Sequence, residues 1–124
     1  MTENRSYEEQ LQARQKQFDA IVEGAMSRVT SQIAGRQPPL HSHFFYGASA
    51  IHPKHLVAWY VFRTDSELKA ARRSGLTSQI EVATHAELAA GGFPQDGVEL
   101  VAVSFDSDQN IRRTAGGNYR DYFQ

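Results

Sequence analysis

The sequence of 124 residues contains no cysteine. This absence excludes disulfide scaffolds, cysteine-ligated zinc, iron–sulfur clusters and thiol catalysis. The longest unbroken apolar run, Leu56 to Phe62, is far too short to span a membrane, and the polar, acid-containing start of the chain is unlike a secretory leader. We therefore expect a cytoplasmic protein that does not contact a membrane.

An excess of positive charge is also lacking, since 13 Lys and Arg oppose 14 Asp and Glu for a net charge of −1. Nucleic acid is not the expected partner, because nonspecific binding to it needs a positive field. The sequence has no G-x-S-x-G or H-E-x-x-H motif and no glycine-rich dinucleotide fingerprint. No catalytic residue and no cofactor are predicted, and the interpretation leans against an enzyme.

Hydrophobic residues make up 40% of the chain and charged residues 22%, which is typical of one globular domain over residues 1–124. Residues 1–6 are polar and are expected to be frayed. From Tyr7 to Ile33 the apolar residues recur in steps of three and four, which predicts one long amphipathic helix. Ser6 is the expected N-cap of this helix, and Gly35 is expected to end it.

Two segments rich in aromatic and β-branched residues follow, His41 to Ile51 and His55 to Thr64. The short stretch between them suits a turn near Pro53, so we expect a long antiparallel hairpin. Val98 to Phe105 predicts a third strand. Asn118 to Phe123 interleaves aromatic and polar residues and predicts a fourth, at an edge of the sheet.

Two helices are expected between the second and third strands. Thr64 offers an N-cap for a helix over Ser66 to Arg73, which Gly75 would end. Leu76 to Ala90 predicts the next helix, although residues 76–83 could also be partly extended.

The resulting order is α-β-β-α-α-β-(α)-β, in which the bracketed helix is a short turn ending near Arg113. Strands come in runs rather than alternating strictly with helices, which is typical of an α+β fold. We expect a mainly antiparallel sheet of about four strands, with the helices packed mainly on one face.

The strands are apolar on both faces. Successive side chains point to opposite sides, yet the second strand has Leu56, Ala58, Tyr60 and Phe62 on one side and Val57, Trp59 and Val61 on the other. Four strands make a sheet roughly 19 Å wide, which needs about two helices, packed some 10 Å apart, on each face. The predicted helices suffice for one face. The remaining cover could be a second copy, a partner protein, a ligand, or loops of the same chain.

Four of the five histidines fall in one short stretch. On a regular strand, His41 and His43 would share one face and could hold a metal with a third ligand such as Asp65. His52 and His55 lie near the turn, too far along the hairpin to join the same ion. The simpler interpretation is polar residues at strand ends and in a turn, and no metal is predicted.

Acidic residues are unevenly distributed. Between Gly75 and Asn110 there is no Lys or Arg, while six acids occur there: Glu81, Glu87, Asp96, Glu99, Asp106 and Asp108. They could cap helices and line a solvated edge, or form a face that meets a basic partner.

We therefore expect a non-catalytic protein that binds another protein or a second copy of itself. A stoichiometric inhibitor or an immunity-type module would fit this description. Large aromatic and arginine side chains often dominate such interfaces, and the candidates are Trp59, Arg63, Tyr119, Arg120, Tyr122 and Phe123. The alternative is a small enzyme, or a binder of a small molecule or metal, with a pocket lined by His, Arg and Tyr.

Overall fold

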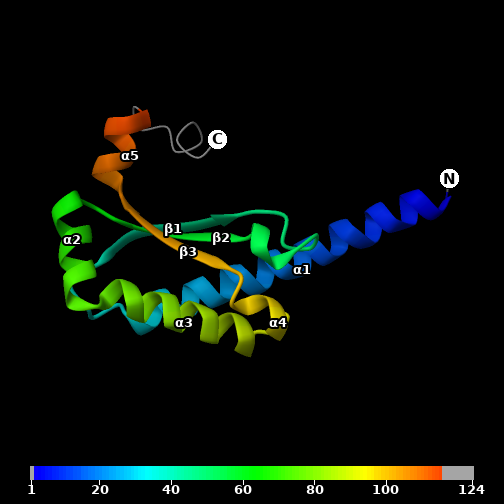
Figure 1. Cartoon of the computed structure of the whole chain (residues 1–124), viewed down its shortest axis with the longest axis horizontal. Coiled ribbons are helices and arrows are strands. Elements are labelled where there is room, and N and C mark those ends of the chain that lie inside the picture. Colours follow the sequence, from blue (N-terminus) through cyan, green and yellow to red (C-terminus); the bar gives the residue numbers. More distant parts are fainter. Residues whose placement is uncertain (1, 116–124) are drawn as a thin grey trace.

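A computed structural model describes residues 2–115, with side chains from residue 6 to residue 114. This part of the chain contains five α-helices, one short 3-10 helix and a three-stranded mixed sheet, and the long helix comes first (Figure 1). The predicted α+β class is confirmed. Within the described residues, no helix is both long and apolar enough to cross a lipid bilayer.

The first helix, α1, runs from Thr2 to Gln32. Its second half is held by burial of apolar side chains, with Val22, Ala25, Met26 and Val29 almost fully shielded from water. Its first half consists largely of good helix formers such as Glu, Gln and Arg. The helix therefore begins earlier than predicted, and Ser6 lies inside it instead of capping it.

The sheet has the strand order β1-β2-β3, formed by Leu40–Tyr46, Val57–Phe62 and Ala102–Ser107. The β1 and β2 strands pair antiparallel, as the hairpin prediction requires, but β2 and β3 pair parallel. The prediction of a mainly antiparallel sheet of about four strands is therefore corrected to a mixed sheet of three strands in the described part. The fourth predicted strand, Asn118 to Phe123, lies outside the described residues.

The parallel pairing follows from the connection between β2 and β3. Parallel neighbours need a long crossover, and α2 (Asp65–Ser74) with α3 (Leu76–Ala90) supplies it. The Thr64 hydroxyl accepts a hydrogen bond from the Glu67 backbone N–H at 3.1 Å, so the predicted cap is present. Gly75 joins the two helices with a φ of 83°, and residues 76–83 are helical throughout.

All three strands are shorter than predicted. The β1 strand stops at Tyr46, where Gly47 turns the chain with a φ of 119°. A β-carbon at Gly47 would lie 1.8 Å from the His55 carbonyl oxygen, so the chain crosses itself where only glycine fits. A 3-10 helix, Pro53–His55, completes this turn. Before β3, Val98 belongs to a short helix, α4 (Gln95–Val98), so the strand begins at Ala102.

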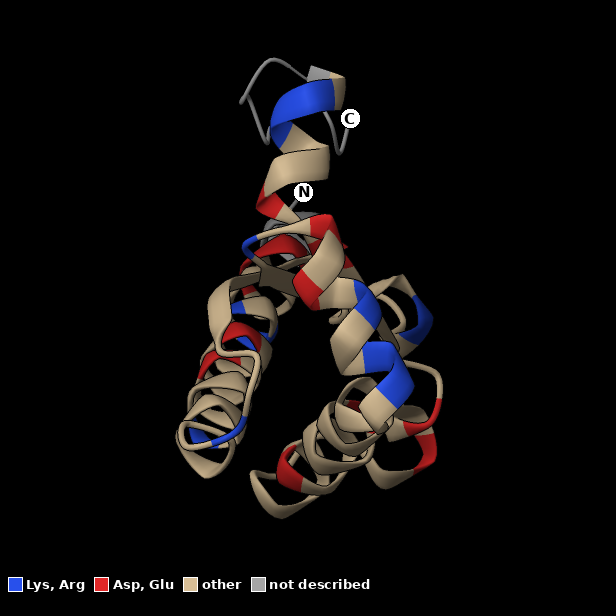
Figure 2. Cartoon of the chain, turned by 90° about the vertical axis from the view of Figure 1, so that its left-hand side faces the viewer, with Lys and Arg blue, Asp and Glu red and all other residues tan. Residues whose placement is uncertain are grey.

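Helices cover the two faces of the sheet unequally. The α1 and α3 helices lie under one face, where Leu56, Ala58, Tyr60 and Phe62 are fully buried (Figure 1). The α2 helix lies across the strand ends instead of on the second face. The last described helix, α5 (Asp108–Ala115), lies on the side of the sheet opposite α1 and α3 (Figures 1 and 2).

Candidate interaction surfaces

The second face of the sheet carries a group of aromatic and apolar side chains, which we call the aromatic sheet face: Phe44, Tyr46, Val57 and Trp59. The Phe44 and Trp59 rings are stacked at 6.3 Å between centroids, with 12° between their planes. The Trp59 Nε1–H donates a hydrogen bond to the Tyr46 hydroxyl at 3.2 Å. The predicted site residue Trp59 thus belongs to a flat aromatic platform spanning β1 and β2.

Arg63, a second predicted site residue, lies just beyond the end of β2. Its guanidinium forms an exposed ion pair with the Glu67 carboxylate at 3.2 Å. Arg63 and His41 line a hollow of about 150 Å³. Ligand pockets usually have volumes of at least about 300 Å³, so this hollow is too small to be a typical one. The other four predicted site residues, Tyr119, Arg120, Tyr122 and Phe123, lie outside the described residues.

The histidine pair is split by an irregularity in β1. The register of the β1–β2 ladder shifts between Leu40 and Ser42, so the strict alternation of side chains is lost at His41. His43 faces α1, where its Nε2 lies 3.6 Å from the Glu23 carboxylate. The His41 Nε2 lies 3.9 Å from the Asp108 carboxylate, at the start of α5. The expectation that both imidazoles share one face is therefore wrong.

Among residues 2–115 no group of three or more His, Asp or Glu side chains is arranged to hold a metal ion. His52 is instead used locally, because its Nδ1 accepts a hydrogen bond from the Lys54 backbone N–H at 3.1 Å.

A polar network joins α2, β3 and α5. The Ser107 hydroxyl donates to the Asp65 carboxylate at 2.5 Å, and the Arg113 guanidinium donates to the other carboxylate oxygen at 3.0 Å. These two hydrogen bonds, that of Ser107 first, hold the pKa of the Asp65 carboxyl below its ordinary value. The Ser107 hydroxyl also accepts the Asn110 backbone N–H at 2.9 Å and so caps α5. This network, formed by Asp65, Ser107 and Arg113, connects α2 to α5, and we call it the joint between the two helices.

The largest hollow among those we describe borders this joint, at about 410 Å³. Trp59 and Lys69 are part of its lining, but two of its polar groups are already satisfied within the chain. Asp65 is held by Ser107 and Arg113. The Asn110 side-chain amide donates to the Asp106 carboxylate at 3.0 Å. The hollow therefore has the dimensions of a ligand pocket, while part of its hydrogen-bonding capacity serves the fold.

A different surface carries three of the five large hydrophobic side chains that are exposed in the described part of the chain. Tyr7 is 64% exposed, Ile51 is 65% exposed and Leu100 is 49% exposed, while Leu11 is half-buried beside them. Tyr7 and Leu11 lie one turn apart on the same side of α1. We call these four residues, with the hollows that Leu11, Ile51 and Leu100 border, the Ile51 surface.

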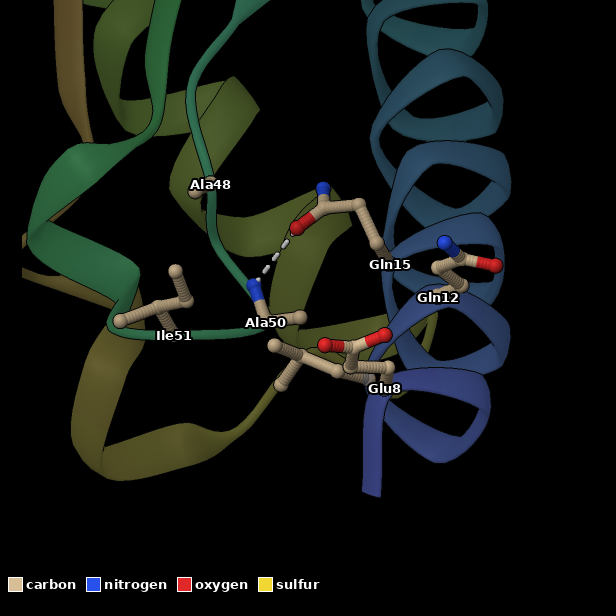
Figure 3. Close-up of a pocket in the computed structure, with 7 residues that line it drawn as sticks. Glu8, Gln12, Gln15, Ala48, Ala50 and Ile51 are labelled. Carbon is tan, nitrogen blue, oxygen red and sulfur yellow. Dashed lines mark hydrogen bonds between the residues drawn. The ribbon is translucent and has the colours of Figure 1, made fainter. Parts of the chain in front are cut away.

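Two adjoining hollows give the Ile51 surface its shape. The first, of about 280 Å³, lies between α1 and the 48–51 loop, as Figure 3 shows. The second, of about 290 Å³, lies between the same loop and α4. Ala50 and Ile51 line both. Ile51 is therefore an exposed apolar ridge between two depressions.

The loop is fixed to α1 by the Gln15 side chain. Its Oε1 accepts the Ala50 backbone N–H at 2.9 Å (Figure 3). Its Nε2 donates to the Ser49 hydroxyl at 3.1 Å. Because Ser49 and Ala50 are buried, the ridge that carries Ile51 is held in one position, and the hollows are formed before any partner arrives.

Sequence reasoning missed this surface. The signal was present in the apolar stripe of α1, which begins at Tyr7 and includes Leu11 and Phe18. Phe18 reaches the core and packs against Phe93, with 5.3 Å between ring centroids. Toward the start of the helix the cover decreases, since Leu11 is only partly buried and Tyr7 is exposed.

Comparison of the chain with protein-family models, with curated proteins and with solved structures finds no match. The functional argument therefore rests on the residues themselves.

Proposed function

We propose that this chain is a non-catalytic protein-binding module that associates with a second copy of itself through the Ile51 surface. The observation that carries the proposal is the exposure of Ile51 and Leu100 on two preformed hollows, with the exposed Tyr7 one helical turn from Leu11 in the lining of the first. Contiguous exposed apolar residues on a folded protein commonly mark an interaction site. A cytoplasmic location, which the cysteine-free composition fits, is part of the same proposal.

A second copy suits this surface because the surface offers both a projection and a depression. The first turns of α1 extend beyond the sheet (Figure 1), and the hollow lined by Leu11 and Ile51 lies at their base. In a twofold pair each subunit uses the same patch, so the projection of one copy can meet the depression of the other.

The spacing along α1 is compatible with this pairing. If two α1 helices cross antiparallel at Leu11, Tyr7 of one copy comes level with Gln15 of the other, since each lies four residues, or about 6 Å, from Leu11. Gln15 is the residue that holds the loop carrying Ile51. The exposed Tyr7 ring would then reach the exposed ridge of the second copy, and each would shield the other from water.

Sedimentation equilibrium tests the proposal over about 1 μM to about 1 mM, the range in which weak interfaces associate. We expect the wild-type chain to shift from monomer to dimer with concentration. The substitution Ile51→Glu should weaken the association at least about tenfold, because it places a charge in an apolar contact.

Val82→Glu is the matched control, because Val82 is also an exposed apolar residue but lies on α3, away from the Ile51 surface. It should associate like the wild type. A wild-type chain that remains monomeric over the whole range would overturn self-association. Equal weakening by both substitutions would overturn the assignment to this surface. Stoichiometric capture of another protein that Ile51→Glu abolishes, from a chain that does not dimerise, would instead support an inhibitor or immunity-type role.

A further inference from the structure

Two oppositely charged side chains of α1 lie at the Ile51 surface. Glu8 lines the hollow between α1 and the 48–51 loop (Figure 3), and Arg14 lines the adjoining hollow. Both residues are exposed. Within residues 6–114, neither the Glu8 carboxylate nor the Arg14 guanidinium belongs to an ion pair. The guanidinium lies over the Phe18 ring, 5.3 Å from its centroid, which fixes the positive charge beside the second hollow.

The two charges are placed symmetrically about Leu11 along the helix. Glu8 precedes Leu11 by three residues and Arg14 follows it by three, which is about 4.5 Å in each direction. A twofold axis beside Leu11 that runs two α1 helices antiparallel therefore brings Glu8 of each copy level with Arg14 of the other. Packed helices lie about 8–10 Å apart, a separation that long charged side chains span in coiled coils. The surface is thus complementary in charge to a second copy of itself.

We propose that two reciprocal ion pairs, Glu8 of each copy with Arg14 of the other, fix the antiparallel orientation of the self-associated chain and make the Ile51 surface selective for a second copy. The proposal rests on the proposed self-association and names the residues that specify it. Charged pairs at the rim of an apolar contact commonly set the orientation and the choice of partner.

The neighbouring charges on α1 do not oppose this arrangement. At 3.6 residues per turn, Glu9 and Lys16 lie about 160° and about 140° around the helix from Leu11. Neither residue lines the two hollows. A parallel arrangement would instead place Glu8 against Glu8 and Arg14 against Arg14, so repulsion between like charges disfavours it.

Charge reversal tests the pairing by sedimentation equilibrium of the full chain, over the same range of about 1 μM to about 1 mM. In Glu8→Arg, and equally in Arg14→Glu, both reciprocal pairs become pairs of like charge. Each variant should therefore self-associate at least about tenfold more weakly than the wild type, because two pairs change sign together.

Recombination of the charges should restore the association. In an equimolar mixture of the two variants every Arg faces a Glu, so the mixed dimer should form about as well as the wild-type dimer. The double variant Glu8→Arg, Arg14→Glu should also associate like the wild type, because it exchanges the two members of each pair.

Glu9→Arg and Lys16→Glu are the matched controls, because they change the net charge by the same amounts on the opposite side of α1. Both positions are exposed, and Glu, Lys and Arg have similar helix propensities, so the fold should be retained in every variant. Circular dichroism checks this. Both controls should associate like the wild type, and weakening equal to that of the Glu8 and Arg14 variants would overturn the assignment to these two residues.

The failure of the pairing and the failure of self-association give different results. If the wild type dimerises and the single reversals dimerise equally well, the ion pairs are overturned while self-association stands. Weak association that neither the mixture nor the double variant restores would also overturn the pairing. A wild-type chain that stays monomeric throughout overturns the self-association itself, and the pairing with it.

Ionic strength gives a second measurement. Raising the salt concentration from about 0.1 M to about 1 M shortens the Debye length from about 10 Å to about 3 Å and screens exposed ion pairs. The association of the wild type should therefore weaken more with salt than that of the neutral double variant Glu8→Gln, Arg14→Gln. An equal dependence on salt in the two proteins would contradict the pairing.

Discussion

Tyr60 joins the central strand to the helix layer. It is fully buried in the middle of β2, and its hydroxyl lies 2.7 Å from the Thr84 hydroxyl of α3. Thr84 donates its own proton to the Ile80 carbonyl at 2.7 Å, so Tyr60 is the donor in the bond between them. Burial raises the pKa of the Tyr60 hydroxyl to about 12.

This shift predicts a specific loss of stability in alkali. In the unfolded chain Tyr60 ionises near pH 10, while in the folded chain it stays protonated until about pH 12. The contribution of the protonated Tyr60 to the free energy of unfolding is therefore complete below pH 10. It is lost as the pH rises from 10 to about 12, which lowers the free energy of unfolding by on the order of 2–3 kcal/mol. Urea denaturation across this pH range measures the fall.

The variant Tyr60→Phe should show a smaller decline over the same interval, at the expense of about 1 kcal/mol at neutral pH from the lost hydrogen bond. Parallel declines in the two proteins would contradict the assignment to Tyr60.

At the scale of elements, local signals predicted the main helices and the β1–β2 hairpin but not the pairing of β2 with β3. Capping residues and glycine stops are read within a few positions, so α2 and α3 were placed correctly from Thr64, Gly75 and the residues between them. The antiparallel β1–β2 hairpin was also predicted, because its two strands are neighbours in sequence. The parallel partner of β2 was missed, because no local signal specifies which distant strand joins an edge.

The same difference between local and long-range signals explains which features of the candidate sites could be predicted. The register shift at His41 depends on how β1 meets β2, so the separation of His41 from His43 could not be read from their spacing. The placement of Trp59 on an apolar face followed from alternation along the strand. The Ile51 surface was missed because an apolar helix stripe gives no information on where its cover ends.

The joint between α2 and α5 is expected to depend on Asp65. In Asp65→Ala, Ser107 and Arg113 lose their shared acceptor, so α5 should open more readily while α1 is unaffected. Hydrogen exchange of the Ile111 amide should therefore accelerate relative to that of the Val29 amide. The Glu81→Ala variant, which changes an exposed acid on α3, is the control.

A dependence on pH accompanies this joint. The pKa of the Asp65 carboxyl is lower in the folded chain than its ordinary value of 3.8. The ionised carboxylate therefore stabilises the joint fully when the pH is above 3.8, and this stabilisation is lost as the pH falls through the lowered pKa. Acceleration of Ile111 exchange in acid should be weaker in Asp65→Ala than in the wild type. Equal acid sensitivity of the two proteins would show that another group holds α5.

At the scale of the whole molecule, most of the apolar surface is sealed on one side of the sheet, and a long helix projects from one end (Figure 1). If two copies pair through the Ile51 surface, dimerisation and folding are linked by mass action. The thermal midpoint of the wild-type chain should then rise with protein concentration. The Ile51→Glu midpoint should be independent of concentration, and differential scanning calorimetry at several concentrations measures both. Flat midpoints for both proteins would argue against a coupled dimer.

The parallel partnership of β2 and β3 also has a consequence for how the chain is made. When the ribosome has completed the β1–β2 hairpin, the other edge of β2 has no neighbour until Ala102–Ser107 has emerged. Synthesis at about 5–20 residues per second leaves that edge unpaired on the nascent chain for several seconds. During this time its backbone can pair with a strand of another chain. Newly made chains, more than finished ones, are thus the population that chaperones have to protect.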